Sequence, residues 1–179
     1  GFRFTFSQAD TSREINQAIG FLARQNLGYP NYDKWVQKAE AEALAGYKRI
    51  IIVRSQGEIA GNLVYQPHKS LPSIIEIKNL RVNPELNGRY FASFMLRQLE
   101  VEAEKERFQA VWVDARENQK EVINFFASQG YNPIETLALY EAGKREVVMI
   151  KPLKQKGRII VPDSKLVSIA REHALSLAL

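Results

Sequence analysis

Apolar residues recur along this chain with two periods, and together they predict strands and amphipathic helices. Apolar residues at every second position, or in short runs, indicate strands over residues 2–6, 50–53, 59–65, 74–82, 108–115, 131–140 and 145–150. Apolar residues three or four positions apart indicate a helix through residues 15–22 and helices over about 32–45, 92–103 and 117–129. The predicted order is therefore strand, helix, helix, three strands, helix, strand, helix and two strands.

Glycines mark several of the predicted boundaries. Gln56-Gly57 separates two strand patterns and predicts a hairpin, and Gly46 predicts the end of the second helix. Gly61 lies inside a strand pattern, where a residue without a side chain indicates a β-bulge or a close approach of another backbone.

The stretch from residue 74 to residue 99 predicts a strand, a tight loop and a helix. The loop over residues 84–88 (PELNG) begins with a proline, which cannot donate to a strand ladder, and its Asn-Gly tolerates positive φ. A helix that follows such a loop directs its first backbone N–H groups into it, and these groups favour an anion. Arg81 and Arg89 add positive charge there. The alternative is a plain strand–helix connection that binds nothing.

The same stretch resembles motif A of the GNAT acyltransferases. In that superfamily a strand ending in Leu-x-Val-x-Pro leads into an Arg/Gln-x-x-Gly-x-Gly/Ala loop, and here residues 80–92 read LRVNPELNGRYFA. On this pattern Asn87 takes the Arg/Gln place, Tyr90 takes the first glycine place, and Ala92 fits the final Gly/Ala place. Asn87 and Tyr90 depart from the pattern. A side chain at Tyr90 could crowd a ligand that has to approach the backbone closely.

The resemblance extends over about residues 2–153, because the predicted order of elements is also the GNAT order. Three further segments match: residues 56–61 (QGEIAG) resemble the second hairpin, 118–131 a helix segment and 147–153 (VVMIKPL) the final strand. The resemblance implies an α/β (α+β) fold, the GNAT acyl-CoA N-acyltransferase fold, with a central mixed, mostly antiparallel sheet flanked by helices. We therefore expect residues 1–153 to form the acyltransferase domain. Residues 154–179 lie outside the resemblance, and their own pattern predicts a basic linker and a C-terminal helix.

The resemblance implies an N-acetyltransferase that uses acetyl-CoA as co-substrate and needs no metal. The acetyl group would pass to a primary amine by direct attack in a ternary complex. The residues that the resemblance places at the acetyl-CoA site come from the strand end, the loop, the helix start and a later turn: Leu80, Arg81, Val82, Asn87, Gly88, Arg89, Tyr90, Phe91, Ala92, Ser93 and Asn118.

Two acidic residues are candidate bases. Glu76 lies four residues before Leu80, where histone-type members of the superfamily place a catalytic Glu, and strand alternation would put it on one face with Leu80 and Val82. Asp114 occupies a position that some N-terminal amine acetyltransferases fill with Glu. A plain exposed carboxylate on a strand is the alternative for each.

The general acid is less clear from the sequence. The tyrosine that usually serves in this superfamily is replaced by Phe126. Tyr131 or Tyr140 would have to substitute for it, or water would protonate the leaving thiolate.

Composition narrows the chemistry further. The chain has 179 residues and no Cys, which excludes disulfides and thiol nucleophiles and fits a cytoplasmic protein. We expect His68 and His173 to be surface or packing residues. The net charge of +5 suits an anionic ligand such as a nucleotide, and nucleic acid is not otherwise indicated. No apolar run approaches the roughly 20 residues of a membrane helix.

Two other functions stay open. Tyr90 and Phe126 would suit a catalytically degenerate domain that binds a CoA ligand or a partner without turnover. The basic residues between 151 and 158, with a helix predicted after Pro162, would suit a protein or nucleic-acid adaptor. That tail could pack on the domain, form a homodimer or begin a further domain. Because the chain begins with Gly, it could be a piece of a longer protein.

Overall fold

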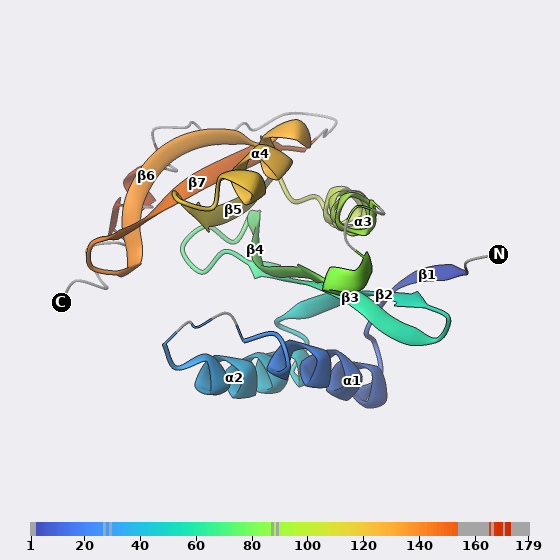
Figure 1. The fold of residues 1–179 in the computed structure, drawn as a ribbon. Helices are drawn as coiled ribbons and strands as arrows, with labels where there is room; N and C mark the ends of the chain where they lie inside the picture. The colour runs from blue at the N-terminus through green and yellow to red at the C-terminus, as the bar shows by residue number, and fades with distance from the viewer. Residues whose placement is uncertain are drawn as a thin grey trace. The chain divides into compact units, whose positions relative to one another are not determined.

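A computed structural model describes residues 3–26, 28, 30–86, 88, 90–153, 165, 167–169 and 171–172 (Figure 1). Its elements follow the predicted order: β1 (Phe4–Gln8), α1 (Ser12–Ala23), α2 (Tyr32–Leu44), β2 (Arg49–Ser55), β3 (Glu58–Pro67), β4 (Ile74–Val82), the 3₁₀ helix η1 (Pro84–Leu86), α3 (Phe91–Lys105), β5 (Ala110–Arg116), α4 (Lys120–Ser128), β6 (Asn132–Glu141) and β7 (Lys144–Pro152).

The strands form one sheet in the order β1-β2-β3-β4-β5-β7-β6. The pairs β1/β2, β2/β3, β5/β7 and β6/β7 are antiparallel, and β4 pairs with β5 in parallel over Ile74–Glu76. The predicted mixed, mostly antiparallel sheet is therefore confirmed. By internal contacts the chain divides into unit 1 (Gly1–Pro67 and Ile77–Glu102) and unit 2 (His68–Glu76 and Ala103–Leu179).

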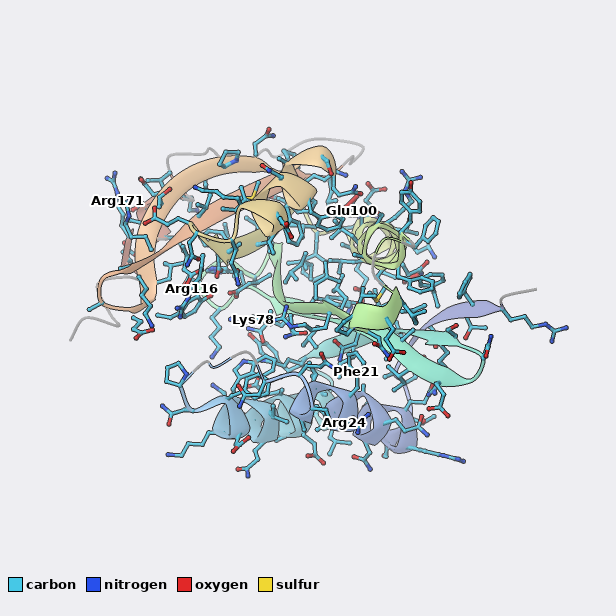
Figure 2. The ribbon with its side chains drawn as sticks, in the orientation of Figure 1. Phe21, Arg24, Lys78, Glu100, Arg116 and Arg171 are labelled. Carbon is cyan, nitrogen blue, oxygen red and sulfur yellow. The ribbon has the colours of Figure 1, made fainter. Side chains whose placement is uncertain are left out.

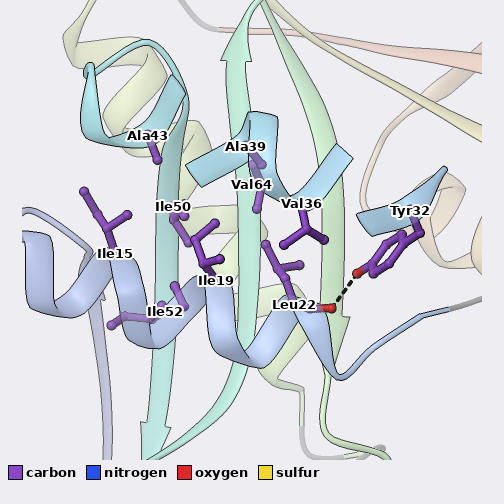
Figure 3. Packing of buried hydrophobic residues seen from close by; sticks show 11 residues of the cluster. Ile15, Ile19, Leu22, Tyr32, Val36, Ala39, Ala43, Ile50, Ile52 and Val64 are labelled. Atoms are coloured by element: carbon purple, nitrogen blue, oxygen red, sulfur yellow. Dashed lines mark hydrogen bonds between the residues drawn. The ribbon is translucent and has the colours of Figure 1, made fainter. Parts of the chain in front are cut away.

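The core of unit 1 lies between the helix pair α1/α2 and strands β2 and β3 (Figure 3). Ile15, Ile19 and Leu22 of α1 lie at helical spacing and pack with Ile52 and Val64 of the strands. The helix α1 begins with a capping box, in which Thr11 and Glu14 bond each other's backbone N–H groups. The hydroxyl of Tyr32 donates to the carbonyl of Leu22 and so joins the start of α2 to the end of α1.

Unit 2 has its own apolar cluster, formed by Ile74 at the start of β4 and by residues of β5, β6 and β7. His68 is buried, its ring lies 4.9 Å from that of Trp112, and its Nδ1 accepts from the N–H groups of Ser70 and Leu71. It is therefore a packing residue, as expected, whereas His173 lies outside the described residues. In the tail, Arg171 pairs with Glu135 of β6 at 3.1 Å.

The close backbone approach predicted at Gly61 is confirmed. A Cβ atom built on Gly61 would lie 2.6 Å from the carbonyl oxygen of Arg81, which no side chain tolerates. Backbone bonds join Ala60 to Asn83 and His68 to Ile74, so eight residue steps of β3 face nine of β4. One residue of β4 is therefore extra, which is the definition of a β-bulge.

The two bonds place the extra residue between Ile74 and Asn83. The sequence-based expectation that Glu76, Leu80 and Val82 share one face stays a prediction.

Substituting Gly61→Ala should destabilise the protein by about 2 kcal/mol, because the new methyl group overlaps a backbone oxygen that cannot move aside alone. Urea unfolding followed by circular dichroism measures this. The matched control is Gly20→Ala in α1, where the nearest atom is the flexible end of Arg24 at 3.6 Å. Since Ala favours a helix over Gly, the control should be neutral or stabilising by up to about 1 kcal/mol. Equal loss in both variants would contradict the close approach at Gly61.

Candidate active site

The loop before α3 turns tightly in unit 1. The Oδ1 atom of Asn83 accepts from the N–H of Glu85 at 3.2 Å, and Gly88 has a φ of 81°. Tyr90 follows with a φ of 62°, in the left-handed region that glycine occupies most easily. Two predicted site residues of this loop, Asn87 and Arg89, lie outside the described residues.

The helix α3 offers backbone donors at its start. Its first internal bond runs from the N–H of Phe94 to the carbonyl of Tyr90, at 3.0 Å. The N–H groups of Phe91, Ala92 and Ser93 precede this bond, so the helix itself does not use them. These three residues were predicted at the acetyl-CoA site, and they provide the amide cluster that an anionic group requires.

The side chain of Tyr90 lies largely in solvent, because the residue is 72% exposed. The next residue, Phe91, is buried and packs edge-to-face on Phe4 with ring centroids 4.7 Å apart. The crowding of a ligand by Tyr90 that the sequence raised stays a prediction.

The end of β4 lies next to this loop in the chain. Leu80, Arg81 and Val82 are all partly buried. The Nη1 atom of Arg81 donates to the carbonyl of Leu80 at 3.0 Å, which folds the guanidinium back along its own strand.

Asp114 is the centre of a polar network in unit 2. The hydroxyl of Tyr140 donates to its Oδ1 at 2.7 Å, and the indole Nε1 of Trp112 donates to its Oδ2 at 3.2 Å. Both carboxylate oxygens are thus oriented by neighbours on β5 and β6. Glu76 of β4 is buried and pairs in register with Trp112. The two predicted bases therefore both belong to this unit.

Glu146 of β7 was not predicted from the sequence. It is 3% exposed, and its Oε1 accepts from the Nε of Arg116 at 3.2 Å, while Nη2 of the same arginine donates to Glu141 at 3.3 Å (Arg116 is labelled in Figure 2). Burial, and then the charge of Asp114, raise the pKa of Glu146 to about 7 against the opposing effect of Arg116. The signal was present: in strand 145–150, Glu146 alternates in step with the buried Val148 and Ile150.

The two candidate general acids differ clearly. Tyr131 is 1% exposed, lies edge-to-face on Phe126 at 5.3 Å and has the Nζ of Lys151 5.7 Å from its ring centre, as a core residue does. Tyr140 is exposed as a residue (44%), but its hydroxyl donates to Asp114. Burial of that hydroxyl, and then the charge of Asp114, hold the pKa of Tyr140 well above its ordinary value. Its proton therefore stays in place at neutral pH.

Asn118 lies in the turn between β5 and α4 and is exposed. The N-cap residue of α4 is Gln119, which makes no side-chain cap hydrogen bond and whose N–H donates to the carbonyl of Arg116 at 2.9 Å. Asn118 therefore directly precedes the N-cap residue.

The model of the acetyltransferase (GNAT) family matches residues 14–131, which include the loop, the start of α3 and Asp114. The chain belongs to this family. It is an acetyltransferase by family and fold, and the family implies acetyl-CoA as co-substrate and an amine as acceptor.

Solved structures of GNAT proteins share its fold at low sequence identity. The ribosomal-protein-S18-alanine N-acetyltransferase of Escherichia coli has a TM-score of 0.71 at 18% identity, covering 89% of this chain and 100% of its own. Ard1 of Thermoplasma volcanium has 0.69 at 13%, covering 85% and 99%. An N-acetyltransferase of Staphylococcus aureus has 0.67 at 14%, covering 85% and 99%. The search of curated proteins found no match to the chain.

Two absences hold for the described residues of this GNAT protein. They contain no group of three or more His, Asp or Glu side chains placed to hold a metal ion. None of their helices has the length and apolar character that crossing a membrane requires.

The raised pKa of Glu146 predicts how stability depends on pH. The folded state holds this proton up to about pH 7, whereas the unfolded chain releases it near its ordinary value of 4.5. The folded protein therefore binds more protons between these values, and its stability falls as pH rises through them. Relative to Glu146→Gln, which cannot titrate, the wild type should lose on the order of 2 kcal/mol between pH 5 and 8.

Urea unfolding of both proteins at pH 5 and pH 8 measures this difference. Glu141→Gln, which removes the exposed partner of the same arginine, is the control and should not reproduce it. A wild type that gains stability relative to Glu146→Gln as pH rises would contradict the buried, protonated carboxyl.

Proposed function

We propose that this GNAT protein transfers an acetyl group from acetyl-CoA to a primary amine by direct attack within a ternary complex. The observation that carries the proposal is the Tyr140–Asp114 hydrogen bond of 2.7 Å, in the same unit as Glu76 and Glu146. Unit 2 therefore contains a protonated hydroxyl and carboxyl groups, the general acid and base that amine acylation needs.

The co-substrate fits the described residues of unit 1. The N–H groups of Phe91, Ala92 and Ser93 would hold its diphosphate, since amides at a helix start favour anions. Leu80 to Val82 would hold the pantetheine arm through backbone groups at the end of β4. When bound, acetyl-CoA supplies the acetyl group as an activated thioester.

Glu76 is the proposed base. It would take the proton that the amine nitrogen loses on bonding to the acetyl carbon, either directly or through a water molecule. Asp114 suits this role less well, because its two oxygens already accept from Tyr140 and Trp112. We assign Asp114 instead to orienting Tyr140.

Tyr140 is the proposed acid, in place of Tyr131 and of the phenylalanine at position 126. Its hydroxyl would give its proton to the sulfur as the carbon–sulfur bond breaks, and water would restore that proton. The packing of Tyr131 argues against it as the acid. Its ring lies between Phe126 and Lys151 and is only 1% exposed, as expected of a core residue.

The acceptor is proposed only as a primary amine. One structural neighbour is named for acting on an alanine of a ribosomal protein, so peptide α-amines belong in an acceptor panel beside lysine side chains and polyamines. We also propose that the protein works in the cytoplasm, since a chain without Cys fits a reducing compartment.

Two measurements test the function. Acetyl-CoA should raise the melting temperature, because a ligand that binds the folded state stabilises it. Release of free CoA thiol should then depend on adding an amine. No thermal shift would contradict the proposal, and a shift without amine-dependent thiol release would show a binding protein without turnover.

Tyr140→Phe should lower kcat for the acetylated amine about 100-fold, because it removes the proton donor but keeps the ring. The affinity for acetyl-CoA, measured calorimetrically, should be unchanged. Tyr47→Phe is the matched control, since it removes a hydroxyl that donates to the carbonyl of Pro67, and it should keep its activity. If Tyr131→Phe lost activity and Tyr140→Phe did not, the assignment of the acid would be reversed.

A further inference from the structure

Tyr90 combines three properties that its place in the motif does not explain. Its backbone takes the left-handed conformation that a motif glycine would take, with φ 62°. Its ring is 72% exposed, more than any other large apolar or aromatic side chain among the described residues. Within those residues, its contacts comprise the backbone bond from Phe94 and no hydrogen bond or ring contact of the side chain.

The backbone that carries this ring adjoins a packed start of α3. Phe91 is buried against Phe4, and Phe6 lies 5.8 Å from Phe94 one turn into α3. These packed rings hold the first turn of α3 in unit 1. The backbone of Tyr90, which directly precedes that turn, is therefore attached to a packed element. A tyrosine offers a flat surface at low entropic cost, which suits stacking on another ring.

The proposed function determines what reaches this ring, and the inference rests on it. In acetyl-CoA the diphosphate joins the pantetheine arm on one side and adenosine on the other. With the diphosphate on the N–H groups of Phe91 to Ser93 and the arm directed toward β4, the adenosine leaves the helix start on the other side, toward solvent. Tyr90 directly precedes those amides and is 72% exposed, whereas Phe94, which directly follows them, is 53% exposed and has its ring 5.8 Å from that of Phe6.

We propose that Tyr90 is the platform on which the adenine ring of acetyl-CoA stacks. Its replacement of the motif glycine then adds a contact to the nucleotide end of the co-substrate. The left-handed backbone keeps the amides open as glycine would, and the exposed phenol supplies the aromatic face. A purine on a tyrosine is a favourable pair that needs no specific hydrogen bond.

Calorimetric titration with two ligands isolates this contact. Acetyl-CoA carries adenine, whereas S-acetyl-4′-phosphopantetheine carries the thioester arm without it. Tyr90→Leu should weaken acetyl-CoA binding about tenfold and leave phosphopantetheine binding unchanged, because only the first ligand reaches the ring. Tyr90→Phe, which keeps the ring, should bind both ligands as the wild type does.

A backbone effect is separated by a third variant. Tyr90→Gly relaxes the positive φ and also removes the ring, so it should match Tyr90→Leu on acetyl-CoA. Dephospho-CoA, which keeps adenine but lacks the 3′-phosphate, should show the same loss in Tyr90→Leu as acetyl-CoA does.

Four results would overturn the inference. Equal weakening of both ligands in Tyr90→Leu would show a general effect on the loop. Tighter binding of acetyl-CoA by Tyr90→Gly would show that the tyrosine obstructs the site. If the wild type bound phosphopantetheine and acetyl-CoA equally well, acetyl-CoA binding would stand without an adenine contact, whereas no binding of either would refute the proposed function as well.

Discussion

The close approach of β3 to β4 at Gly61 is the constraint on which much of unit 1 depends. The carbonyl oxygen of Arg81 occupies the space that a side chain at residue 61 would need. Strand β4 ends at Val82, one residue after this contact, and η1 and α3 follow from Pro84 and Phe91. Met95 of α3 also lies against Gly61, so one small residue sets both strand and helix.

In unit 2, the partly buried carboxyl group of Asp114 and the buried one of Glu146 each have specific hydrogen-bond partners. Asp114 receives two neutral donors, whereas Glu146 receives one charged donor from Arg116. Neutral donors fix direction without cancelling charge, and the charge of Asp114 therefore still acts on Glu146 and Tyr140. The pKa values of Glu146 and Tyr140 are therefore set by the burial and charges of these side chains together.

The sequence predicted the order of all strands and helices through β7, because each has a clear period of two or 3.6 and most are bounded by glycine or proline. The close approach at Gly61 was also predicted, since a glycine inside a strand usually marks a bulge or a neighbouring backbone. The pairing register between β3 and β4 could not be predicted, because an extra residue in β4 does not change the hydrophobic pattern of the strand.

The site was predictable where it depends on the backbone and less so where it depends on burial. The backbone N–H donors at the start of α3 were predictable, because every helix leaves its first N–H groups without partners inside the helix. The importance of Glu146 depends on how deeply β7 is covered, which a single strand does not reveal. The exposure of Tyr90 could not be predicted, because a motif position that glycine normally holds gives no information on where a side chain there would lie.

Arg116 joins two carboxylates from the two strands of the β6–β7 hairpin, and these differ in exposure. The side chain of Glu141 is 37% exposed and that of Glu146 is 4% exposed. Dissolved ions screen an exposed pair far more than a covered one. Raising the ionic strength should therefore weaken the Arg116–Glu141 pair more than the Arg116–Glu146 pair. The mobility of the turn between β6 and β7 should then increase with salt concentration.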